Sequence, residues 1–201
     1  MSTVDHLPPS PISGLRTLEL GVEHEPLLQQ FFEANPAYFL AVQGEPPIPG
    51  EAKEEIEGEL PAEFTYTKKW VIGYLSQDGT LAAMANFVSD ILAPNVWCVS
   101  TFIVATARHG CGDAKTIYES LEAWAASNGA CWLRLGVVAG HTRAERFWRS
   151  RGYVETRTRE GYRIGRRLNT LRVMYKPLSG GTLADYLSLV ERDRPEGQRA
   201  G

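Results

Sequence analysis

The stretch "ARHGCGDAKTIYESLEAWA", residues 107–125, places two glycines directly before an amphipathic helix. Gly110 and Gly112 allow the backbone to bend and allow a ligand to approach without meeting a Cβ atom. The first N–H groups of a helix have no internal partners, and they lie at the positive end of the helix dipole. The stretch therefore predicts an anion site, most often for phosphate, and a plain tight turn between strand and helix is the alternative.

The elements around this stretch place it in a sheet. The segment 96–105, "VWCVSTFIVA", is almost continuously apolar, which predicts a central strand. Apolar residues then recur every three and four positions from Ala114 to Ala125, which predicts a helix with one buried face. The glycine turn thus falls at the carboxyl end of a central strand, where α/β sheets bind ligands.

Further elements are predicted on both sides. Strands are expected at 15–21, 63–76, 80–91, 130–138, 153–159 and 169–178, and helices at 24–34, 37–44, 51–60, 141–151 and 182–193, with a hairpin-like excursion at 161–169. This order predicts an α/β fold with a mixed sheet. It suggests a disordered lead-in over 1–14, one domain over 15–178, and a C-terminal helix and tail over 179–201.

Composition excludes several classes of protein. The 201 residues are 43% apolar and 22% charged, as in an ordinary globular protein, and no apolar run is long enough to span a membrane. The N-terminus does not read as a signal peptide, and three cysteines without a CxxC pair favour free thiols in the cytoplasm. The four histidines are too dispersed for a metal cluster, so no metal is expected.

Charge is unevenly distributed although the net charge is only −3. Residues 1–64 carry twelve acidic side chains, and residues 141–172 carry ten arginines. Nucleic-acid binding through these arginines is the weakest interpretation, because no nucleic-acid motif accompanies them. Neither a nucleic acid nor a membrane is expected as a partner, and a homodimer is a further expectation.

Two familiar phosphate sites do not fit the glycine turn. In a dinucleotide motif GxGxxG, Lys115 stands in place of the third glycine, and the next strand ends without the acid that binds ribose. In a P-loop GxxxxGK[ST], His109 and Ala114 stand in both glycine positions. Because neither motif fits, the identity of the anion has to be inferred from the sequence on either side of the turn.

The turn and the segment that follows resemble the GCN5-related N-acetyltransferases, the GNAT superfamily. That family has Q/R-x-x-G-x-G/A between a central strand and a helix, then N-x-x-A-x-x-F-Y-x-x-x-G-F. Here the second pattern reads His141-x-x-Ala144-x-x-Phe147-Trp148-x-x-x-Gly152-Tyr153. The resemblance covers roughly residues 66–178, and it implies a mostly antiparallel sheet with a splayed central strand pair flanked by helices.

Three positions depart from the family pattern. Ala107 stands at the Gln/Arg position, with Arg108 one residue later, and His141 replaces the frequent asparagine. Trp148 replaces the tyrosine that often serves as general acid. Cofactor binding tolerates these changes because backbone amides carry most of it, but the catalytic assignment does not transfer intact.

The resemblance implies a mechanism with acetyl-CoA as co-substrate. The central strand is expected to leave its neighbour beyond a bulge near 101–103, so that amides of Ile103 and Val104 hold pantetheine and a backbone N–H stabilises the oxyanion. Amides of the turn would hold the pyrophosphate; they belong to Arg108, His109, Gly110, Cys111, Gly112, Asp113 and Ala114. Arg149 is the first choice for the 3′-phosphate.

Several of these residues keep a second interpretation. Cys111 fits a small filler residue better than a reactive thiol, and His109 fits a solvent-facing turn as well as a phosphate contact. His141 is expected either to cap its helix or to touch pantetheine, while Phe147 and Trp148 fit core packing at least as well as cofactor binding. Asp90, after the strand 80–91, is the candidate general base, with a turn or capping role as the alternative.

The implied function is acetyl transfer from acetyl-CoA to an amine of a small molecule or peptide. The glutamates between Glu45 and Glu59 suggest a cationic acceptor, since clustered carboxylates attract cations. A non-catalytic module that binds or senses acyl-CoA is the alternative, because the family's tyrosine is missing.

Overall fold

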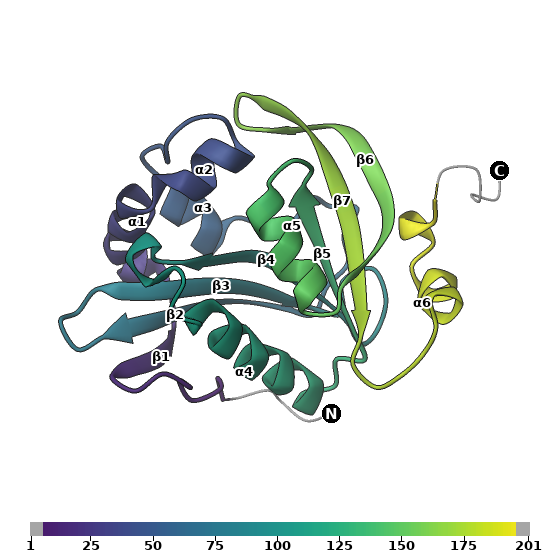
Figure 1. Ribbon diagram of the computed structural model, residues 1–201, viewed down its shortest axis with the longest axis horizontal. Coiled ribbons are helices and arrows are strands. Elements are labelled where there is room, and N and C mark those ends of the chain that lie inside the picture. The colour runs from purple at the N-terminus through teal and green to yellow at the C-terminus, as the bar shows by residue number, and fades with distance from the viewer. Residues whose placement is uncertain (1–5, 196–201) are drawn as a thin grey trace.

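A computed structural model describes residues 6–195 of the chain. Its centre is a single seven-stranded sheet in the order β1-β2-β3-β4-β5-β7-β6 (Figure 1). The strands are β1 (Leu15–Glu19), β2 (Lys68–Ser76), β3 (Leu81–Ser89), β4 (Val96–Val104), β5 (Trp132–Val138), β6 (Val154–Ile164) and β7 (Arg167–Pro177). All neighbouring strands are antiparallel except β4 and β5, which are parallel. The fold is therefore the mixed, mostly antiparallel α/β sheet that the sequence predicts.

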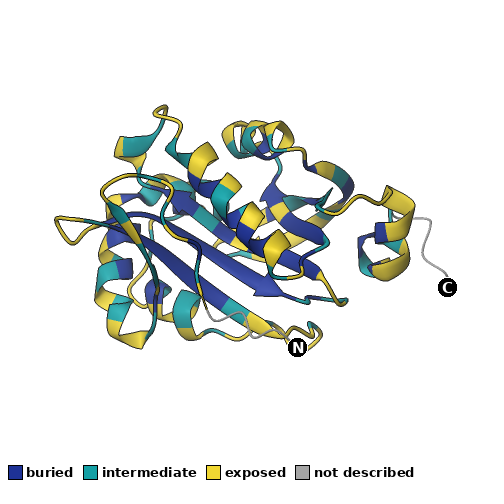
Figure 2. Cartoon of the chain, turned by 90° about the horizontal axis from the view of Figure 1, so that it is seen from below, coloured by how far each residue is buried: buried dark blue, intermediate teal, exposed yellow. Residues whose placement is uncertain are grey.

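Helices cover both faces of this sheet. They are α1 (Glu25–Ala34), α2 (Pro36–Val42), α3 (Glu51–Glu57), α4 (Asp113–Ser127), α5 (Thr142–Ser150) and α6 (Leu183–Leu189), with short 3-10 turns η1 (Val22–His24), η2 (Thr106–Arg108) and η3 (Glu191–Asp193). Helices α1 to α3 bury their apolar sides against one core cluster, and α4 and α5 bury theirs against another. Figure 2 shows the buried strands between helices whose outer surfaces are exposed.

The predicted central strand and helix are confirmed. Strand β4 lies in the middle of the sheet, and most of its side chains are buried. The predicted apolar face of α4 is buried through Ile117, Tyr118, Leu121, Trp124 and Ala125. This face packs against a stacked pair of indoles from strands β2 and β4, Trp70 and Trp97, whose ring centroids are 5.1 Å apart. The helix that follows the glycine turn is thus fixed firmly to the sheet.

Three segments differ from the sequence-based expectation. Residues 6–14, expected to be disordered, lie against the core, because Leu7 and Ile12 pack on it and the Trp124 indole donates to the carbonyl of His6 at 3.0 Å; residues 1–5 of that lead-in lie outside the described chain. The excursion at 161–169 is the continuous end of the β6–β7 hairpin. The C-terminal helix ends at Leu189, and η3 follows it.

The C-terminal segment is attached to the sheet by a buried ion pair. Arg134 on β5 donates two hydrogen bonds to Asp193, at 2.7 and 2.9 Å, and Asp193 is completely buried. Tyr186 of α6 donates a third hydrogen bond to the same carboxylate at 2.6 Å. Because these donors satisfy the buried charge, α6 and η3 form part of the folded domain.

Two kinds of feature are absent from the described residues. Between residues 6 and 195, no helix combines the length and apolar character needed to cross a membrane. The same part of the chain contains no group of three or more His, Cys, Asp or Glu side chains arranged to hold a metal ion.

Candidate active site

The two central strands separate soon after they meet. Strands β4 and β5 pair only through Val96–Cys98 and Trp132–Arg134 in the described chain. On its other side, β4 shifts register against β3 between Thr101 and Val99, which leaves Ser100 as the extra residue of a bulge. A bulge bends its strand. Beyond it the facing edges of β4 and β5 are open, one residue earlier than the sequence predicts.

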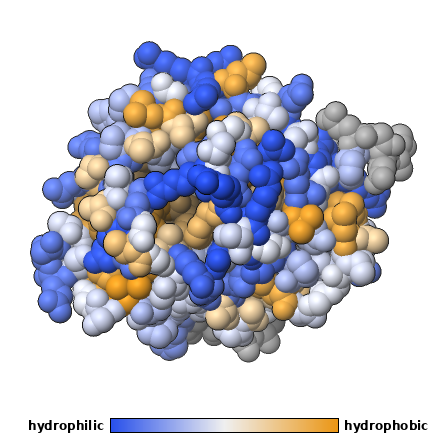
Figure 3. All heavy atoms as spheres, in the orientation of Figure 1, coloured by the Kyte–Doolittle hydropathy of each residue, from blue (hydrophilic) through white to orange (hydrophobic). Residues whose placement is uncertain are grey.

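A first cavity of about 550 Å³ lies where β4 ends (Figure 3). Its walls come from the end of β4, the turn after it, the first turn of α4, helix α5 and the α1–α2 junction. Seven residues predicted to bind the cofactor line it: Ile103, Val104, His109, Ala114, His141, Phe147 and Trp148. In Figure 3 this hollow has apolar residues inside and hydrophilic side chains at its rim.

The glycine turn at the mouth of α4 has the open geometry that the sequence predicts. Gly110 and Gly112 have φ values of +86° and +89°, and a Cβ atom added to either would meet no heavy atom within 4 Å. Gly112 is the N-cap of α4, so the first N–H groups of the helix follow it. The exposed Cys111 lies between the two glycines.

Two contacts fix the shape of this turn. Arg108 forms an ion pair with Asp113, within the predicted anion site. The ring Nε2 of His109 lies 2.8 Å from the carbonyl oxygen of Val104, and since a carbonyl only accepts, this nitrogen carries the proton. Neither Arg108 nor Asp113 lines the first cavity, so their side chains shape the turn.

The α1–α2 junction is tied to the same turn. Asn35 is buried, and its side-chain oxygen accepts a hydrogen bond from the backbone N–H of Thr106 at 2.7 Å. Its amide group donates to the carbonyl of Phe31 at 2.8 Å. Both Asn35 and Thr106 line the first cavity. No signal in the sequence points to Asn35, because its hydrogen-bond partner Thr106 is 71 residues away along the chain.

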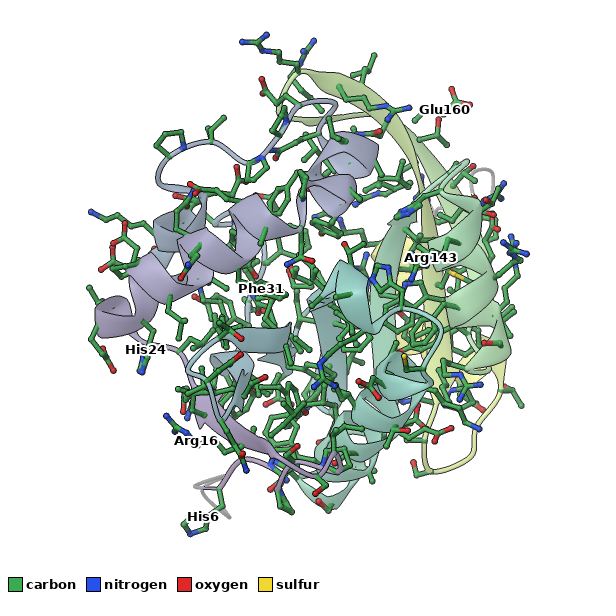
Figure 4. The ribbon with its side chains drawn as sticks, turned by 60° about the vertical axis from the view of Figure 1, so that its left-hand side comes forward. His6, Arg16, His24, Phe31, Arg143 and Glu160 are labelled. Carbon is green, nitrogen blue, oxygen red and sulfur yellow. The ribbon has the colours of Figure 1, made fainter. Side chains whose placement is uncertain are left out.

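Helix α5 presents different arginines to the cavity than the sequence analysis expected. Arg143 and Arg146 line the first cavity, and no described residue forms an ion pair with either of them. Arg149 lies outside the lining, with its guanidinium 3.1 Å from Glu145 and 3.9 Å from Glu155. Figure 4 shows Arg143 on the side of α5 that faces the N-terminal helices. The signal that identifies Arg143 is its spacing, four residues before Phe147 and three before Arg146, which places these side chains on one side of the helix.

A second cavity of about 340 Å³ lies on the other side of the strand gap. Strands β4 to β7, helix α2 and the segment 60–64 line it. Five residues line both cavities, and these mark the junction: Tyr38, Phe102, His141, Ala144 and Trp148. The two cavities thus adjoin each other at the gap between β4 and β5.

Trp148 occupies the junction at the position of the family's tyrosine. It is 8% exposed, and its ring packs against Tyr118 and Tyr153 at centroid distances of 5.3 and 5.4 Å. The hydroxyls of these two tyrosines bond to each other at 3.0 Å, and neither residue lines a cavity. Tyr153 is therefore a packing residue. The junction's one phenol is that of Tyr38 among the described residues.

A polar cluster lies behind Tyr38. Glu55 of α3 accepts hydrogen bonds from Asn86 at 2.7 Å and from the Thr101 hydroxyl at 3.3 Å. Burial raises the pKa of the Glu55 carboxyl, and the hydrogen bonds from Asn86 and Thr101 oppose this shift. Burial also raises the pKa of Tyr38, the charge of Glu55 acts in the same direction, and a hydrogen bond with Thr101 opposes both. Sequence reasoning missed this cluster.

His141 contributes a titratable ring at the same junction. It is the N-cap residue of α5, but its side chain makes no capping hydrogen bond. Partial burial lowers the pKa of this imidazole, and the neighbouring charge of Arg143 lowers it further. Its ring is therefore neutral at physiological pH, and it lines both cavities. Of its two predicted roles, the position beside the first cavity favours the ligand contact.

Asp90 lies elsewhere. It has a φ of +53° in the turn between β3 and β4, and its carboxylate accepts a hydrogen bond from the backbone N–H of Asn95 at 2.8 Å. It lines neither cavity. This geometry agrees with the turn role that was the alternative, and it gives no support to Asp90 as the general base.

Comparison with known proteins identifies the family. The model of the acetyltransferase (GNAT) family matches residues 27–153, and no curated protein matches the chain. Among solved structures, the fold is similar to an acetyltransferase from Salmonella typhimurium that modifies the N-terminal serine of ribosomal protein L7/L12. The TM-score is 0.66 at 13% identity, over 84% of this chain and 98% of that one.

Two further structures have the same architecture. An acetyltransferase from Thermus thermophilus has a TM-score of 0.64 at 17% identity, over 82% of this chain and 97% of that one. Spermidine N-acetyltransferase from Vibrio cholerae, in complex with CoA and spermine, has a TM-score of 0.63 at 15% identity, over 84% and 98%. Likeness at these identities concerns the fold, and the family match covers more than half of the chain. The chain belongs to the GNAT family of acetyltransferases.

Proposed function

We propose that this acetyltransferase holds acetyl-CoA in the first cavity and receives its amine through the second, so that the acetyl group is transferred at the junction. The observation that carries this proposal is the pair of cavities joined at the β4–β5 gap. Two separate approaches to one point allow two substrates to meet in line, which makes the step effectively unimolecular.

The first cavity fits a CoA molecule chemically. The glycine turn leaves room for a pyrophosphate beside the free N–H groups of α4. Arg143 and Arg146 supply positive charge that no described acid neutralises. Ile103 and Val104 bring strand β4 to the cavity, and their backbone edge facing β5 has no strand partner there. When bound, acetyl-CoA supplies the acyl group as an activated thioester.

Glu55 is our candidate for the final proton acceptor. Tyr38 and Thr101 stand between it and the junction: the Thr101 hydroxyl donates to Glu55 at 3.3 Å, and Tyr38 is close enough to Thr101 and Glu55 for both to shift its pKa. A proton leaving the amine passes along these hydroxyls to the carboxylate. Burial suits this role, because the raised pKa of Glu55 makes its ionised form a stronger base than an exposed glutamate.

Tyr38 is the candidate acid in place of the family's tyrosine. Its phenol belongs to both cavities, and its pKa is raised by burial, so it carries its proton at neutral pH. A protonated phenol at the junction is able to donate to a departing thiolate, and the proton taken up by Glu55 then returns through Thr101 to restore the phenol. The indole of Trp148 has no acidic proton in this range, so we assign it to the wall of the junction.

Thiol release tests the proposal against a non-catalytic sensing module. Purified protein is incubated with acetyl-CoA and with single amines from a panel: a monoamine, a diamine, an amino sugar, an amino acid and a peptide with a free N-terminus. We expect thiol release that depends on the amine and matches the N-acetyl product by mass spectrometry. CoA binding by calorimetry without thiol release from any panel member would instead support the sensing module.

The acidic residues of the chain bear on which class of amine the enzyme accepts. The glutamates between Glu45 and Glu59 favour a cationic amine, and Glu54 and Glu59 remain exposed. However, Glu45 pairs with Arg166 at 2.8 Å and Glu57 with Lys53 at 3.8 Å. In addition, no acidic side chain lines either cavity among the described residues. A cationic acceptor therefore remains an alternative, and the panel tests it directly.

A cytoplasmic location and a homodimer also remain proposals. Cys98, Cys111 and Cys131 are unpaired, which is compatible with a reducing cytoplasm. A homodimer is a prediction that size-exclusion chromatography with light scattering measures.

A further inference from the structure

One charged side chain in the second cavity has no partner. Arg159 on β6 lines this cavity and is half-buried. Among residues 6–195, none forms a hydrogen bond or an ion pair with its guanidinium. Half-buried arginines usually satisfy their donors on protein groups or on a ligand. The five N–H donors of Arg159 are therefore available to a molecule in the cavity.

Arg159 lies among three other arginines. Burial lowers the pKa of Arg159, and the charges of Arg192, Arg134 and Arg157 lower it further. The nearby carboxylate of Asp193 opposes these effects, but it already accepts hydrogen bonds from Arg134 and Tyr186. Nothing else on the cavity wall offsets this charge, because the described lining contains no acid.

Apart from Arg134, which is paired with Asp193, the rest of the described wall is apolar or neutral. Phe64, Ile91 and Leu171 lie on it, together with the side chains of the junction. Among the described residues, the guanidinium of Arg159 is thus the one unpaired charge on a largely apolar wall, which also includes the residues of the junction. Small-molecule sites commonly combine an apolar wall with a few placed polar groups that fix the orientation of the ligand.

Strand register gives the distance between Arg159 and the strand gap. Arg159 pairs with Leu171 of β7, and Leu171 pairs with Val138 of β5, which borders the strand gap. Two strand spacings are about 10 Å. The side chain of Arg159 extends from that position into the cavity. An acceptor several bonds long spans the distance from this guanidinium to the junction.

We infer that Arg159 binds a carboxylate of the acceptor, so that the enzyme acetylates a small molecule carrying a primary amine at one end and a carboxylate at the other. A planar guanidinium matches a carboxylate by two parallel hydrogen bonds, and it orients the amine end toward Tyr38 and Trp148. This inference rests on the proposed function, since it places the acceptor in the second cavity, and it favours a zwitterionic acceptor over the cationic one that the acidic segment suggests.

Matched acceptors test the inference. Thiol release is measured with an n-alkylamine, a diamine, an ω-amino carboxylate and an ω-amino phosphonate of equal chain length. We expect the highest kcat/KM for the carboxylate, and we expect Arg159→Gln to lower that value by about 10- to 100-fold while leaving the alkylamine unchanged. Arg163→Gln is the matched control, because Arg163 lies on the same strand, is exposed and lines neither cavity.

A binding measurement separates the two proposals. Calorimetry with the N-acetylated ω-amino carboxylate requires no turnover, and we expect affinity that Arg159→Gln abolishes and Arg163→Gln retains. Binding of this kind without thiol release from any amine contradicts the proposed function and leaves the Arg159 site supported. Thiol release that is fastest with the alkylamine or the diamine, and unchanged in Arg159→Gln, overturns the inference and leaves the proposed function intact. A preference for the phosphonate over the carboxylate overturns the assignment of the anion. Melting temperatures confirm that both variants fold.

Discussion

The side-chain amide of Asn86 on β3 donates a 2.7 Å hydrogen bond to the carboxylate of Glu55 on α3. Asn86 is paired in the sheet with Thr101, and Thr101 donates to the second carboxylate oxygen. The pair Asn86–Thr101 is the last one before the bulge at Ser100 shifts the register. Glu55 therefore holds both strands at the point where β4 begins to leave β5.

Glu55→Gln is expected to change the pH dependence of turnover. Because burial raises the pKa of Glu55 above its ordinary value of 4.5, the basic form accumulates only at higher pH. In the native enzyme kcat/KM should rise with pH through this raised pKa. Glu55→Gln should lower kcat by about 10²- to 10⁴-fold and remove this acidic limb. Glu54→Gln, an exposed change on the same helix, is the control. An unchanged limb in Glu55→Gln would exclude the carboxylate as the base.

The same pKa shift affects stability in a definite direction. The folded protein keeps the Glu55 proton to a higher pH than the unfolded chain does. Stability should therefore fall as the pH rises from about 4.5 through the folded pKa. Urea denaturation at several pH values should show this decline in the native protein and a smaller decline in Glu55→Gln. Equal declines in both proteins would show that other groups cause it.

Tyr38→Phe tests the proposed acid. Removing the phenol should lower kcat by about 10²-fold or more, while the KM for acetyl-CoA changes little, because the ring and its packing remain. Trp148→Phe is the comparison at the same junction, and it should keep the alkaline limb of the pH profile. If Trp148→Phe loses that limb and Tyr38→Phe keeps it, the assignment of the acid is reversed.

Gly110→Glu should weaken CoA binding without unfolding the protein. The substitution puts a side chain and a negative charge at the open turn, and its φ of +86° adds strain of about 1–2 kcal/mol. Gly79→Glu has a comparable φ of +84° and equally open surroundings, but it lies in the β2–β3 turn away from both cavities. Calorimetry should show at least a tenfold loss of CoA affinity in Gly110→Glu alone. Similar affinities in the two variants would contradict the pyrophosphate site.

Arginines on α5 should distinguish CoA from dephospho-CoA. Arg143→Ala and Arg146→Ala each remove an unpaired charge from the first cavity, so each should weaken CoA by roughly tenfold. At least one of them should weaken dephospho-CoA less, which would locate the 3′-phosphate. Arg149→Ala breaks ion pairs outside the cavity, and it should affect both ligands equally. A selective loss in Arg149→Ala would restore the role that the sequence suggested for it.

Asp193→Asn should destabilise the fold. It leaves Arg134 buried with a weakened partner, and breaking a buried pair costs about 3–5 kcal/mol. Although burial acts to raise the pKa of Asp193, the hydrogen bond from Arg134 lowers it below 3.8. Its stabilisation is therefore complete above that pH and is lost as the pH falls through the lower folded value. Glu191→Gln, which breaks an exposed pair with Arg194, should change the melting temperature very little.

The glycine turn was predictable because its signal is local. Two glycines, the strand before them and the amphipathic helix after them are adjacent in sequence, and each pattern follows from backbone geometry. The family resemblance then supplied the splayed strands, which no local pattern reveals. The position of α5 was predictable too, yet Arg149 was preferred over Arg143, which lies four residues before Phe147, and over Arg146, which lies three residues after Arg143.

The polar cluster was not predictable from sequence for a physical reason. Glu55 is one of several glutamates in an acidic helix, and only tertiary contacts distinguish it from its neighbours. Its partners Asn86 and Thr101 are 31 and 46 residues away along the chain. Asp90 was chosen as the base because it follows an apolar strand, but the end of that strand turns toward Asn95 and away from the junction.

The three residue pairs that join β4 to β5 are also the only strand pairing between two half-sheets, β1 to β4 and β5 to β7, in the described chain. A ligand whose amides bond to both strand edges would extend this short seam, so its free energy of binding would couple the opening of one half to the opening of the other. Amide hydrogen exchange should then slow in β5 and β7 when CoA is added, even at positions that the ligand never touches. The concentration of CoA would in this way determine whether the two half-sheets open separately or together.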